Sequence, residues 1–528
     1  MASAAPQKSR RFAWLRFSHQ HTAFSATLLL MVAALLSRVI GLVREKYIAY
    51  LFGAGAQTDA YRAAFQLPDM INYFLVGGVA SVTFVTILSR YREQGREQEG
   101  EHALGAILGM MLVVLGLGVG VAEVFARSYV AWWFDGFSPE KVALTTHMTR
   151  IMLPGQMFFF TGGVLGSVLL VRKQFAYQAA MGLIYNLGII FGGVLLASRM
   201  GVSSLAVGAL SGAFLGALVP SWIGVWRAGV RLRLSLDWGH AGVREWVRMS
   251  LPLMLGVTLV TFDTWIINHL ASHGNGEIAR LNFAKALFTA PMAILGQAAG
   301  AASLPFFAAL FGQGKRHEFA AQVNSAVTRI IAVSLLGSAW MIGLAAPVVD
   351  LVLRGGALGR TTAAAIAVYF AIFAISLFLW ASQSIYARAF YAAGNTVTPM
   401  VAGTIITVLS LPVYWTMYHA HGAIGLAIAS DIGIFAQTAA MAGLLHTKGL
   451  VKLGGLGGAE LLRSLAAALV AFTALEAVVR LMPHAATHLG DLLVLAAGSA
   501  VWFGVSFAVL KATGSALPNQ LLRRFAKR

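Results

Sequence analysis

Apolar residues form long uninterrupted stretches along most of the chain, and polar residues gather in the short segments between them. A stretch of about 20 apolar residues is long enough to cross a hydrocarbon core of about 30 Å as an α-helix. Segments such as 111–125 show none of the two-residue alternation that is typical of a membrane β-barrel. The pattern therefore predicts an all-α, polytopic membrane protein.

This pattern predicts about fourteen transmembrane helices, at approximately 24–51, 66–90, 103–126, 143–171, 177–198, 202–227, 249–272, 282–311, 322–346, 363–390, 397–418, 422–446, 460–481 and 487–511. We expect two lobes of six helices around a central cavity, followed by two C-terminal helices. The expected boundaries are a basic N-terminal segment at 1–23, an N-terminal lobe at 24–230, an amphipathic linker at 231–248, a C-terminal lobe at 249–446, the last two helices within 447–513, and a basic tail at 514–528.

The distribution of positive charge predicts the orientation of the chain. Lysine and arginine occur near both ends and in alternate connections, whereas the connection at 412–424 has neither. By the positive-inside rule, both termini and the linker are expected in the cytoplasm. The formal net charge of +19 is spread thinly over these loops and forms no basic face interleaved with aromatic residues, so it does not indicate a nucleic-acid-binding protein.

Two distant segments resemble each other and suggest an internal repeat. Residues 67–95 and 290–315 share an early proline, glycines in mid-span, a later serine and a basic exit. The prolines, Pro68 and Pro291, are 291 − 68 = 223 residues apart, and six predicted spans fit within this offset. The two lobes are therefore expected to be parallel repeats, with chance similarity of glycine-rich spans as the alternative.

Two arginines lie within the first predicted span. Arg38 and Arg44 stand in its second half, where a charge within the bilayer costs about 2.5–3.5 kcal/mol at the centre and usually faces a bundle interior or a wet cavity. Six residues of ideal helix rotate by about 240°, so these two side chains converge only if the helix bends, for example at Gly41. The alternative is that they extend to the membrane surface.

Other charged residues also lie in or beside apolar stretches. Asp59 precedes span 2, where it is placed to cap the following helix, and Lys285 enters span 8. Asp263 lies deep in span 7, and Asp431 lies in span 12. A buried carboxylate needs a partner, so Asp263 either forms an ion pair with a cation of span 1 or span 8 or binds a coupling Na⁺ or proton; we favour the ion pair.

No catalytic motif is present. The sequence has no HExxH, GxSxG, Walker or CxxC pattern, and it has no cysteine. His419 and His421 have no third ligand beside them, so we interpret them as solvated. We expect no catalytic residue, no metal site, no cofactor and no enzyme activity. Fixed positive charge at membrane depth instead suits an anionic cargo such as a diphosphate.

Three segments carry a family resemblance: 37-SRVIGLVREKYIAYLFGAGAQTDAYRAAFQLP-68, 280-RLNFAKALFTAPMAILGQAAGAASLPFF-307 and 388-RAFYAAGNTVTP-399. They resemble the first-span signature, the span 7–8 region and the span 10–11 connection of the MurJ/MviN family, the lipid II flippases of the MOP exporter superfamily. The resemblance covers essentially the whole chain, and it implies a bacterial inner-membrane protein of peptidoglycan synthesis.

The resemblance also implies roles for individual residues. Arg38 and Arg44 correspond to arginines that engage the diphosphate of the lipid-linked substrate, Asp59 to the acidic position of the TDA motif, and Lys285 lies near another functional arginine. Family members commonly carry an arginine and a glutamate where this chain has Asn72 and Gly77. These departures weaken the group of cationic side chains that the resemblance implies for the cavity. An arginine at position 72 would be expected to join Arg38 and Arg44 in that group.

The leading hypothesis is a flippase that moves a polyprenyl-diphosphate-linked cell-wall precursor (lipid II) from the inner to the outer leaflet by alternating access, in contact with membrane lipids. The membrane potential, Na⁺ or H⁺ are the candidate driving forces. The first alternative is a cation-coupled exporter of another lipid-linked saccharide or small molecule, which would use Asp263 or Asp431. The second is a transport-impaired paralogue that acts as a scaffold for cell-wall synthesis proteins.

Overall fold

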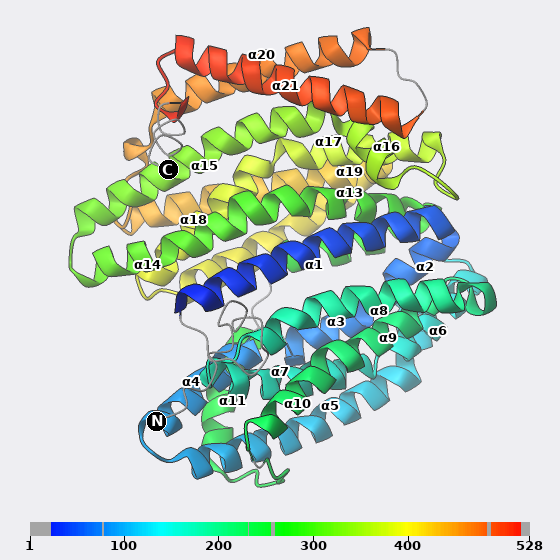
Figure 1. Ribbon diagram of the computed structural model, residues 1–528, viewed down its shortest axis with the longest axis vertical. Coiled ribbons are helices and arrows are strands. Elements are labelled where there is room, and N and C mark those ends of the chain that lie inside the picture. The colour runs from blue at the N-terminus through cyan, green and yellow to red at the C-terminus, as the bar shows by residue number, and fades with distance from the viewer. Residues whose placement is uncertain (1–22, 77–78, 231, 255–258, 483–486, 519–528) are drawn as a thin grey trace, which may run out of the picture. The chain divides into compact units, whose positions relative to one another are not determined.

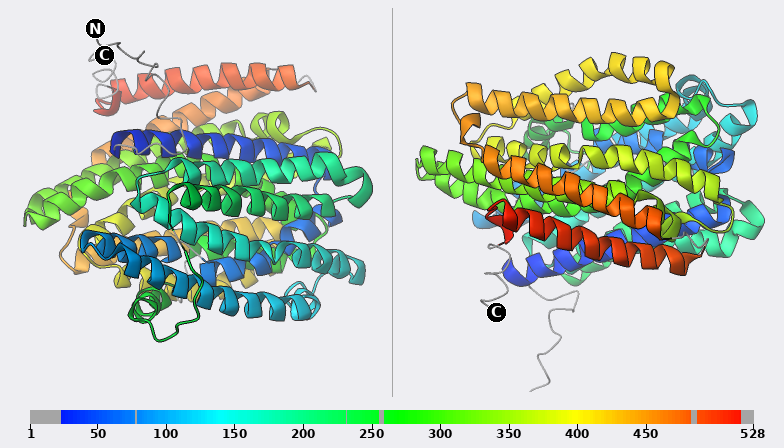
Figure 2. Two further views of the ribbon diagram at one scale, coloured as in Figure 1. Left: turned by 60° about the horizontal axis from the view of Figure 1, so that its bottom comes forward. Right: turned by 90° about the horizontal axis from the view of Figure 1, so that it is seen from above.

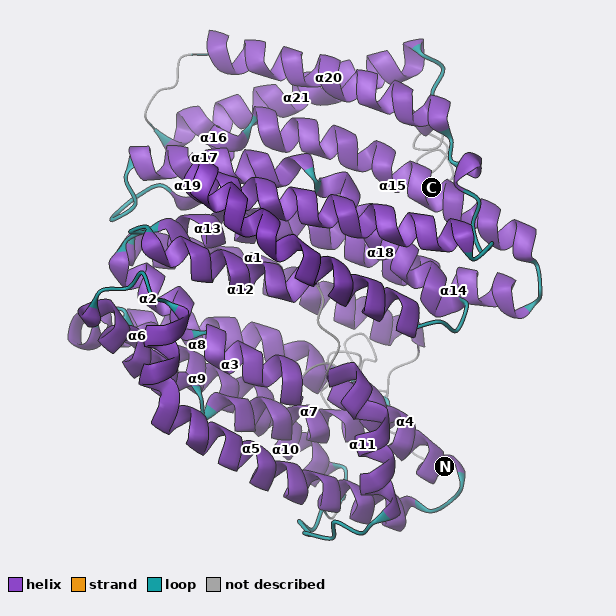
Figure 3. Cartoon of the chain, turned by 180° about the vertical axis from the view of Figure 1, so that it is seen from behind, coloured by secondary structure: helices purple, strands orange, loops and turns teal. Residues whose placement is uncertain are grey.

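The computed structural model describes residues 23–76, 79–230, 232–254, 259–482 and 487–518. Within these ranges the chain consists of helices joined by short loops (Figure 3), and the sole β-type pairing is one bridge between Gly355 and Leu358. The predicted all-α class is confirmed for the described residues. The basic segments that were expected at the two ends lie largely outside these ranges.

The chain divides into two compact units, one with residues up to Tyr47 and Ala60–Leu255, and one with Ile48–Asp59 and the residues from Gly256 onwards. Both units share α1 (Ala23–Phe52) and α2 (Ala56–Ala64). The first unit contains α3 (Gln66–Ile71), η2 (Asn72–Val76), α4 (Val79–Glu93), α5 (Glu97–Trp133), α6 (Pro139–Met152), α7 (Gly155–Val171), α8 (Ala176–Met200), α9 (Ser203–Ala213), η3 (Phe214–Leu218), α10 (Val219–Arg227) and α11 (Ala241–Met254). The second contains α12 (Leu259–Leu270), η4 (Ala271–His273), α13 (Glu277–Met292), η5 (Ala293–Ala298), α14 (Ala299–Gly312), α15 (Arg316–Gly343), α16 (Ala345–Leu353), α17 (Arg360–Ile375), α18 (Leu377–Ala392), α19 (Val397–Thr447), η6 (Leu453–Gly455), α20 (Gly458–Leu481) and α21 (His488–Ala512).

Many of these helices can cross a membrane. Nine helical segments of the described residues are long and apolar enough, and the pair α17 and α18, bent by 43°, would make a tenth. The predicted number of fourteen is not confirmed by this count. The spans predicted at 397–418 and 422–446 correspond to the two helical halves of α19, which are separated by a kink with non-helical backbone at Gly422. Those predicted at 66–90 and 249–272 include residues outside the described ranges, and the span at 24–51 coincides with α1.

The predicted internal repeat is visible in the backbone. Pro68 of α3 precedes the π-helix η2, and Pro291 of α13 precedes the π-helix η5, so both prolines lead into the same local structure. Gly201 after α8 has φ 56° and ψ −138°, and Gly422 within α19 has φ 59° and ψ −139°. Only glycine adopts such a conformation readily. These two glycines are 422 − 201 = 221 residues apart, which makes the α8–α9 hairpin equivalent to the two halves of α19.

Glycines bring α8 and α9 into backbone contact (Figure 1). A Cβ atom built on Gly188 would lie 2.5 Å from the Cα atom of Gly212, and one built on Gly192 would lie 2.4 Å from the Cα atom of Gly208. Lipid tails are as apolar as leucine, so helices in a membrane associate largely through such close packing of small residues. This hairpin holds α8 rigidly, and α8 supplies a polar contact to α1 that is described below.

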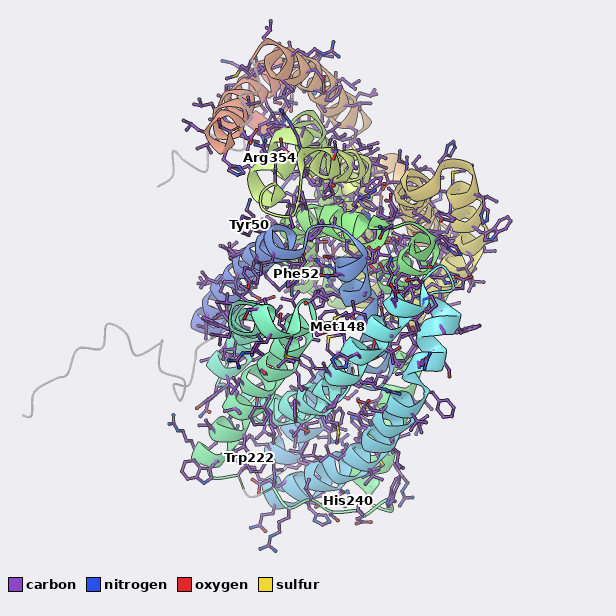
Figure 4. All side chains as sticks on the ribbon, turned by 90° about the vertical axis from the view of Figure 1, so that its right-hand side faces the viewer. Tyr50, Phe52, Met148, Trp222, His240 and Arg354 are labelled. Atoms are coloured by element: carbon purple, nitrogen blue, oxygen red, sulfur yellow. The ribbon has the colours of Figure 1, made fainter. Side chains whose placement is uncertain are left out.

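The last two helices, α20 and α21, lie side by side and run in opposite directions, as Figures 1 and 2 show. Within the second unit, an ion pair joins this pair of helices to α16. Arg354, labelled in Figure 4, follows α16 and donates to Asp491 in the first turn of α21 over 2.7 Å. Asp350 of α16 lies 3.6 Å from the same guanidinium. The C-terminal helices are thus anchored at this end by buried charges.

Candidate functional site

The first unit contains a buried carboxylate between two arginines. Glu45 of α1 is 2% exposed and accepts hydrogen bonds from Arg44, its neighbour, and from Arg62 of α2. Arg44 also donates from Nη1 to the Oδ1 atom of Asn186 on α8, over 2.9 Å. This arginine cluster, consisting of Arg44, Glu45, Arg62 and Asn186, contains two cations and one carboxylate. It therefore has an excess of positive charge.

Arg38 is not part of the arginine cluster. The helix α1 runs without a break from Ala23 to Phe52, so Gly41 does not produce the bend on which convergence of Arg38 and Arg44 depended. Arg38 is exposed, and it makes no hydrogen bond or ion pair with any described residue. Arg44 instead turns towards α8. The six-residue spacing therefore leaves the two arginines on different faces of α1.

Asp59 caps a helix, but not the one that was expected. It lies within α2, not before it, and its side chain is completely buried in the second unit. Its carboxylate accepts hydrogen bonds from the backbone N–H groups of Gly276 (2.6 Å) and Ala279 (2.9 Å) at the start of α13. The first N–H groups of a helix have no partner within it, and a carboxylate there also interacts favourably with the helix dipole. The contacts of Asp59 are those of a structural residue.

The second unit contains the ion pair that we favoured for Asp263. Lys285 of α13 donates from Nζ to Asp263 of α12, and it also contacts the hydroxyl of Thr264 at 3.0 Å. Tyr414 of α19 donates its hydroxyl to the other oxygen of Asp263. Asp263 is 1% exposed, and these two contacts satisfy both of its carboxylate oxygens inside the protein. We name Asp263, Lys285, Tyr414 and Asp431 the aspartate cluster.

Asp431 lies in the second half of α19 and interacts electrostatically with Asp263 and Tyr414. Its Oδ1 atom is buried and has no hydrogen-bond partner among the described residues. An unsatisfied carboxylate oxygen is costly in such a position. The aspartate cluster therefore contains two carboxylates for one lysine, which is the reverse of the arginine cluster.

Asn72 lies inside the first unit, at the start of the π-helix η2. Its Nδ2 atom donates to Oε1 of Gln156 on α7 over 2.9 Å. Both side chains line a cavity of about 170 Å³, together with Asp69 and Tyr185. Position 72 therefore faces the interior of this unit. Gly77, the other departure from the family pattern, lies outside the described residues.

Sequence reasoning did not assign Glu45, Arg62 or Tyr414 to a site. A signal for Arg62 was present, because it stands 68 − 62 = 6 residues before Pro68, and Lys285 stands 291 − 285 = 6 residues before Pro291. Arg62 pairs with a carboxylate of α1, and Lys285 pairs with a carboxylate of α12.

Among the described residues, no group of three or more His, Cys, Asp and Glu side chains is arranged to hold a metal ion.

Known protein sequences resemble this chain over most of its length. The family described as "Lipid II flippase MurJ" matches residues 48–499. The lipid II flippase MurJ of Burkholderia cenocepacia is 27% identical over 426 residues, which cover 78% of this chain and 81% of that protein. The probable lipid II flippase MurJ of Buchnera aphidicola subsp. Acyrthosiphon pisum is 26% identical over 404 residues, which cover 75% of this chain and 78% of that protein.

Solved structures share the fold. A lipid II flippase MurJ in an inward closed conformation superimposes with a TM-score of 0.77 at 18% identity, covering 92% of this chain and 99% of that one. An inward-facing multidrug resistance MATE family transporter of the MOP superfamily superimposes with a TM-score of 0.64 at 15% identity, covering 80% of this chain and 98% of that one. At these identities the likeness concerns the fold alone.

Proposed function

Because the chain belongs to the lipid II flippase MurJ family, whose match spans residues 48–499, we propose that its arginine cluster binds the diphosphate of a polyprenyl-diphosphate-linked cell-wall precursor. The family is one of multi-pass membrane transporters. In this proposal the chain carries the precursor from the inner to the outer leaflet by alternating access. The observation that supports the site is the excess of positive charge around Glu45, which lies on the largely apolar helix α1.

Arg44 is the central ligand in this proposal. Two of its nitrogens are occupied by Glu45 and Asn186, while its buried Nε–H has no acceptor among the described residues. A diphosphate oxygen would accept that hydrogen, and a hydrogen bond to a charged group contributes about 1.5–3 kcal/mol. Glu45 holds the two guanidinium groups together, so we assign it a positioning role. Arg38 is exposed on another face of α1, so its role as a ligand of the cargo stays a prediction.

Lys285 and Asp59 have other roles in this proposal. Lys285 neutralises Asp263, so we propose that it serves as a counter-ion and not as a diphosphate ligand. Asp59 holds the start of α13. Asn72 lies at an internal cavity of the first unit, where its side-chain amide donates to Gln156, so we do not assign Asn72 to the cargo.

The membrane potential is the proposed driving force. Moving an anion outward across an inside-negative membrane is favourable by about 2.3 kcal/mol per elementary charge for each 100 mV. Coupling to H⁺ or Na⁺ is the second candidate, and Asp431 is the residue that supports it, because its buried Oδ1 atom has no partner among the described residues. Asp263 is less suited to this role, because Lys285 and Tyr414 already engage both of its oxygens.

We also propose that both termini lie in the cytoplasm. The start of α15, the connection after α19 and the residues just after α21 line one common cavity of the second unit. The positive-inside rule places the same three segments in the cytoplasm. The fourteen spans, with lobes at 24–230 and 249–446 and a final pair within 447–513, remain our proposal for the full topology.

Complementation of a bacterium depleted of its own lipid II flippase tests the function. We expect wild type to restore growth, Arg44→Gln to fail at normal membrane levels, and Arg480→Gln, at an 81% exposed arginine, to behave as wild type. Native mass spectrometry with lipid II should show at least about tenfold weaker binding to Arg44→Gln, corresponding to the loss of one charge-assisted hydrogen bond. Full complementation by Arg44→Gln would show that the diphosphate is held elsewhere.

A further inference from the structure

The second unit contains a cavity of about 770 Å³ that is rich in positive charge. It lies between the first half of α15, the connection 449–457 and the residues just after α21. Arg316, Arg329 and Lys452 line it and are exposed. None of the three forms an ion pair with a described residue. We name it the basic cavity.

The acidic residues around the basic cavity are already engaged. Glu318 pairs with Lys315 at 3.5 Å. Glu460, which lines the cavity, lies 3.7 Å from Arg463 and accepts a hydrogen bond from the hydroxyl of Ser515. The three lining cations therefore lack a counter-charge of their own, and the cavity suits an anion.

Backbone contacts to α15 hold the connection that carries Lys452. Asn324 donates from Nδ2 to the backbone oxygen of Lys452 over 2.9 Å. Thr328 accepts a hydrogen bond from the backbone N–H of Gly457 over 3.1 Å. Asn324 is 4% exposed, so the first of these contacts is built into the protein. Lys452 is thus fixed beside the cationic side chains of α15.

Arg329 lies at the boundary of the apolar part of α15. Residues 322–329 read QVNSAVTR and are mostly polar, and the long apolar run begins at Ile330. An arginine at this boundary can reach the membrane surface or an anionic partner there. The exposed side chain of Arg329 meets that condition at the basic cavity.

An apolar cavity adjoins the basic one. It measures about 460 Å³ and lies between α14, α15 and α18, and Arg329 lines both cavities. Phe306 and Val333 line the apolar cavity and are 66% and 41% exposed, so this surface is open to its surroundings. The basic cavity, which suits an anion, and the apolar cavity, which suits a hydrocarbon chain, are therefore adjacent and share Arg329.

We propose that the two cavities together bind an anionic glycerophospholipid of the cytoplasmic leaflet. Its phosphate pairs with Arg329 and Lys452, its headgroup occupies the basic cavity, and one acyl chain lies in the apolar cavity against Phe306. The charge of the basic cavity fits a phosphate, and the open apolar surface fits a lipid drawn from the bilayer. This site is separate in its residues from the arginine cluster, and the proposal does not depend on the identity of the cargo.

Native mass spectrometry of the delipidated full chain tests the proposal with phosphatidylglycerol and phosphatidylcholine of identical acyl chains. Wild type should retain phosphatidylglycerol in preference to phosphatidylcholine. The double variant Arg329→Gln/Lys452→Gln should bind phosphatidylglycerol at least about tenfold more weakly, and Arg329→Lys should retain the preference. Arg480→Gln removes an exposed arginine of the same unit away from both cavities and should match wild type.

Three results would overturn the proposal. The first is equal retention of the two phospholipids by wild type. The second is unchanged phosphatidylglycerol binding by a double variant whose thermal unfolding matches wild type. The third is displacement of the bound phosphatidylglycerol by stoichiometric lipid II, because the site would then belong to the cargo. Binding of lipid II at Arg44 without such displacement supports two separate sites.

Discussion

A basic residue six positions before the repeated proline forms an ion pair in both units, but the surroundings of the two pairs differ in sign. In the first unit, Arg62 pairs with Glu45, and Arg44 adds a second cation. In the second unit, Lys285 pairs with Asp263, and Asp431 adds a second carboxylate. The repeat has therefore preserved the helices and one ion pair while the neighbouring charges diverged. This difference underlies the proposed binding of an anion in the first unit and of a cation or proton in the second.

The strongest way to break this comparison is to remove Lys285. Lys285→Met leaves two carboxylates without a cation, and loss of one partner of a buried pair typically costs about 3–5 kcal/mol. We expect a large fall in the thermal unfolding midpoint of the purified protein. The double variant Lys285→Met/Asp263→Asn should recover most of it. A single variant as stable as the double would mean that Asp263 carries no charge in the folded protein.

Removal of Arg62 should have a smaller effect on stability. Arg62→Met leaves Glu45 paired with Arg44, so we expect a loss of about 1–2 kcal/mol, close to that of one charge-assisted hydrogen bond. Thermal unfolding of Arg62→Met and Lys285→Met under identical conditions measures the difference directly, with Arg62→Lys as the conservative control. Equal losses would show that Arg44 does not compensate, and the proposed asymmetry would then be wrong.

Asp59 shows that a charged residue of the first-span motif can be structural. Asp59→Ala removes the acceptor of two backbone N–H groups and should cost about 1–2 kcal/mol, the upper range for loss of a helix cap. Hydrogen exchange at the amides of Gly276 and Ala279 should accelerate, whereas exchange in α8 should not change. Asp59→Asn keeps one acceptor oxygen, so its stability should lie between that of wild type and that of Asp59→Ala. Unchanged exchange at both amides would contradict the capping role.

Asn72→Arg sharpens the comparison by adding a cation to the first unit. Because Asp69 lines the same cavity, we expect the new arginine to pair with it, with a change in stability below about 1 kcal/mol and little change in lipid II binding. The double variant Asn72→Arg/Asp69→Asn should bind lipid II more tightly than the single variant. Tighter binding by Asn72→Arg alone would place this position at the cargo, as the family pattern implies.

The smallest expected effect concerns a surface ion pair of the first unit. Arg90 donates to Glu245 of α11, and this hydrogen bond lowers the pKa of the Glu245 carboxyl below its usual value. Glu245 is 32% exposed, so solvent screening limits the stabilisation to about 0.5 kcal/mol. Because the pKa of Glu245 is lower in the folded protein than in the unfolded chain, the ion pair stabilises the fold at pH values above the ordinary pKa of a glutamate. The difference between wild type and Glu245→Gln in thermal unfolding should therefore be present at pH 7 and vanish as the pH falls through the lowered pKa.

The helices and the repeat were predictable because they depend on local patterns. Apolar stretches determine the spans, and glycine at positions 201 and 422 permits the positive φ that the backbone adopts there. The two spans predicted at 397–418 and 422–446 correspond to the two halves of α19, which meet at a kink at Gly422.

The clusters were harder to predict because their partners are distant in the sequence. Asp263 and Tyr414 are 151 residues apart, and no periodicity links them. The lysine for Asp263 was within reach of sequence reasoning, because a deep carboxylate requires a cation on a neighbouring span. The convergence of Arg38 and Arg44 depended on a bend at Gly41, and glycine permits a bend without requiring one.

The cap on α13 has a consequence for biosynthesis. Asp59 and Gly276 are separated by 217 residues, and ribosomes add about 5–20 residues per second, so the acceptor exists for about 10–40 s before its donors are made. During that interval the carboxylate is in the nascent chain without the amides it will hold. The short stretch Ile48–Asp59 can join the second unit only after most of the first has been synthesised. A ribosome that stalls before α13 therefore leaves an early helix whose carboxylate lacks the two backbone amides that it holds in the complete protein.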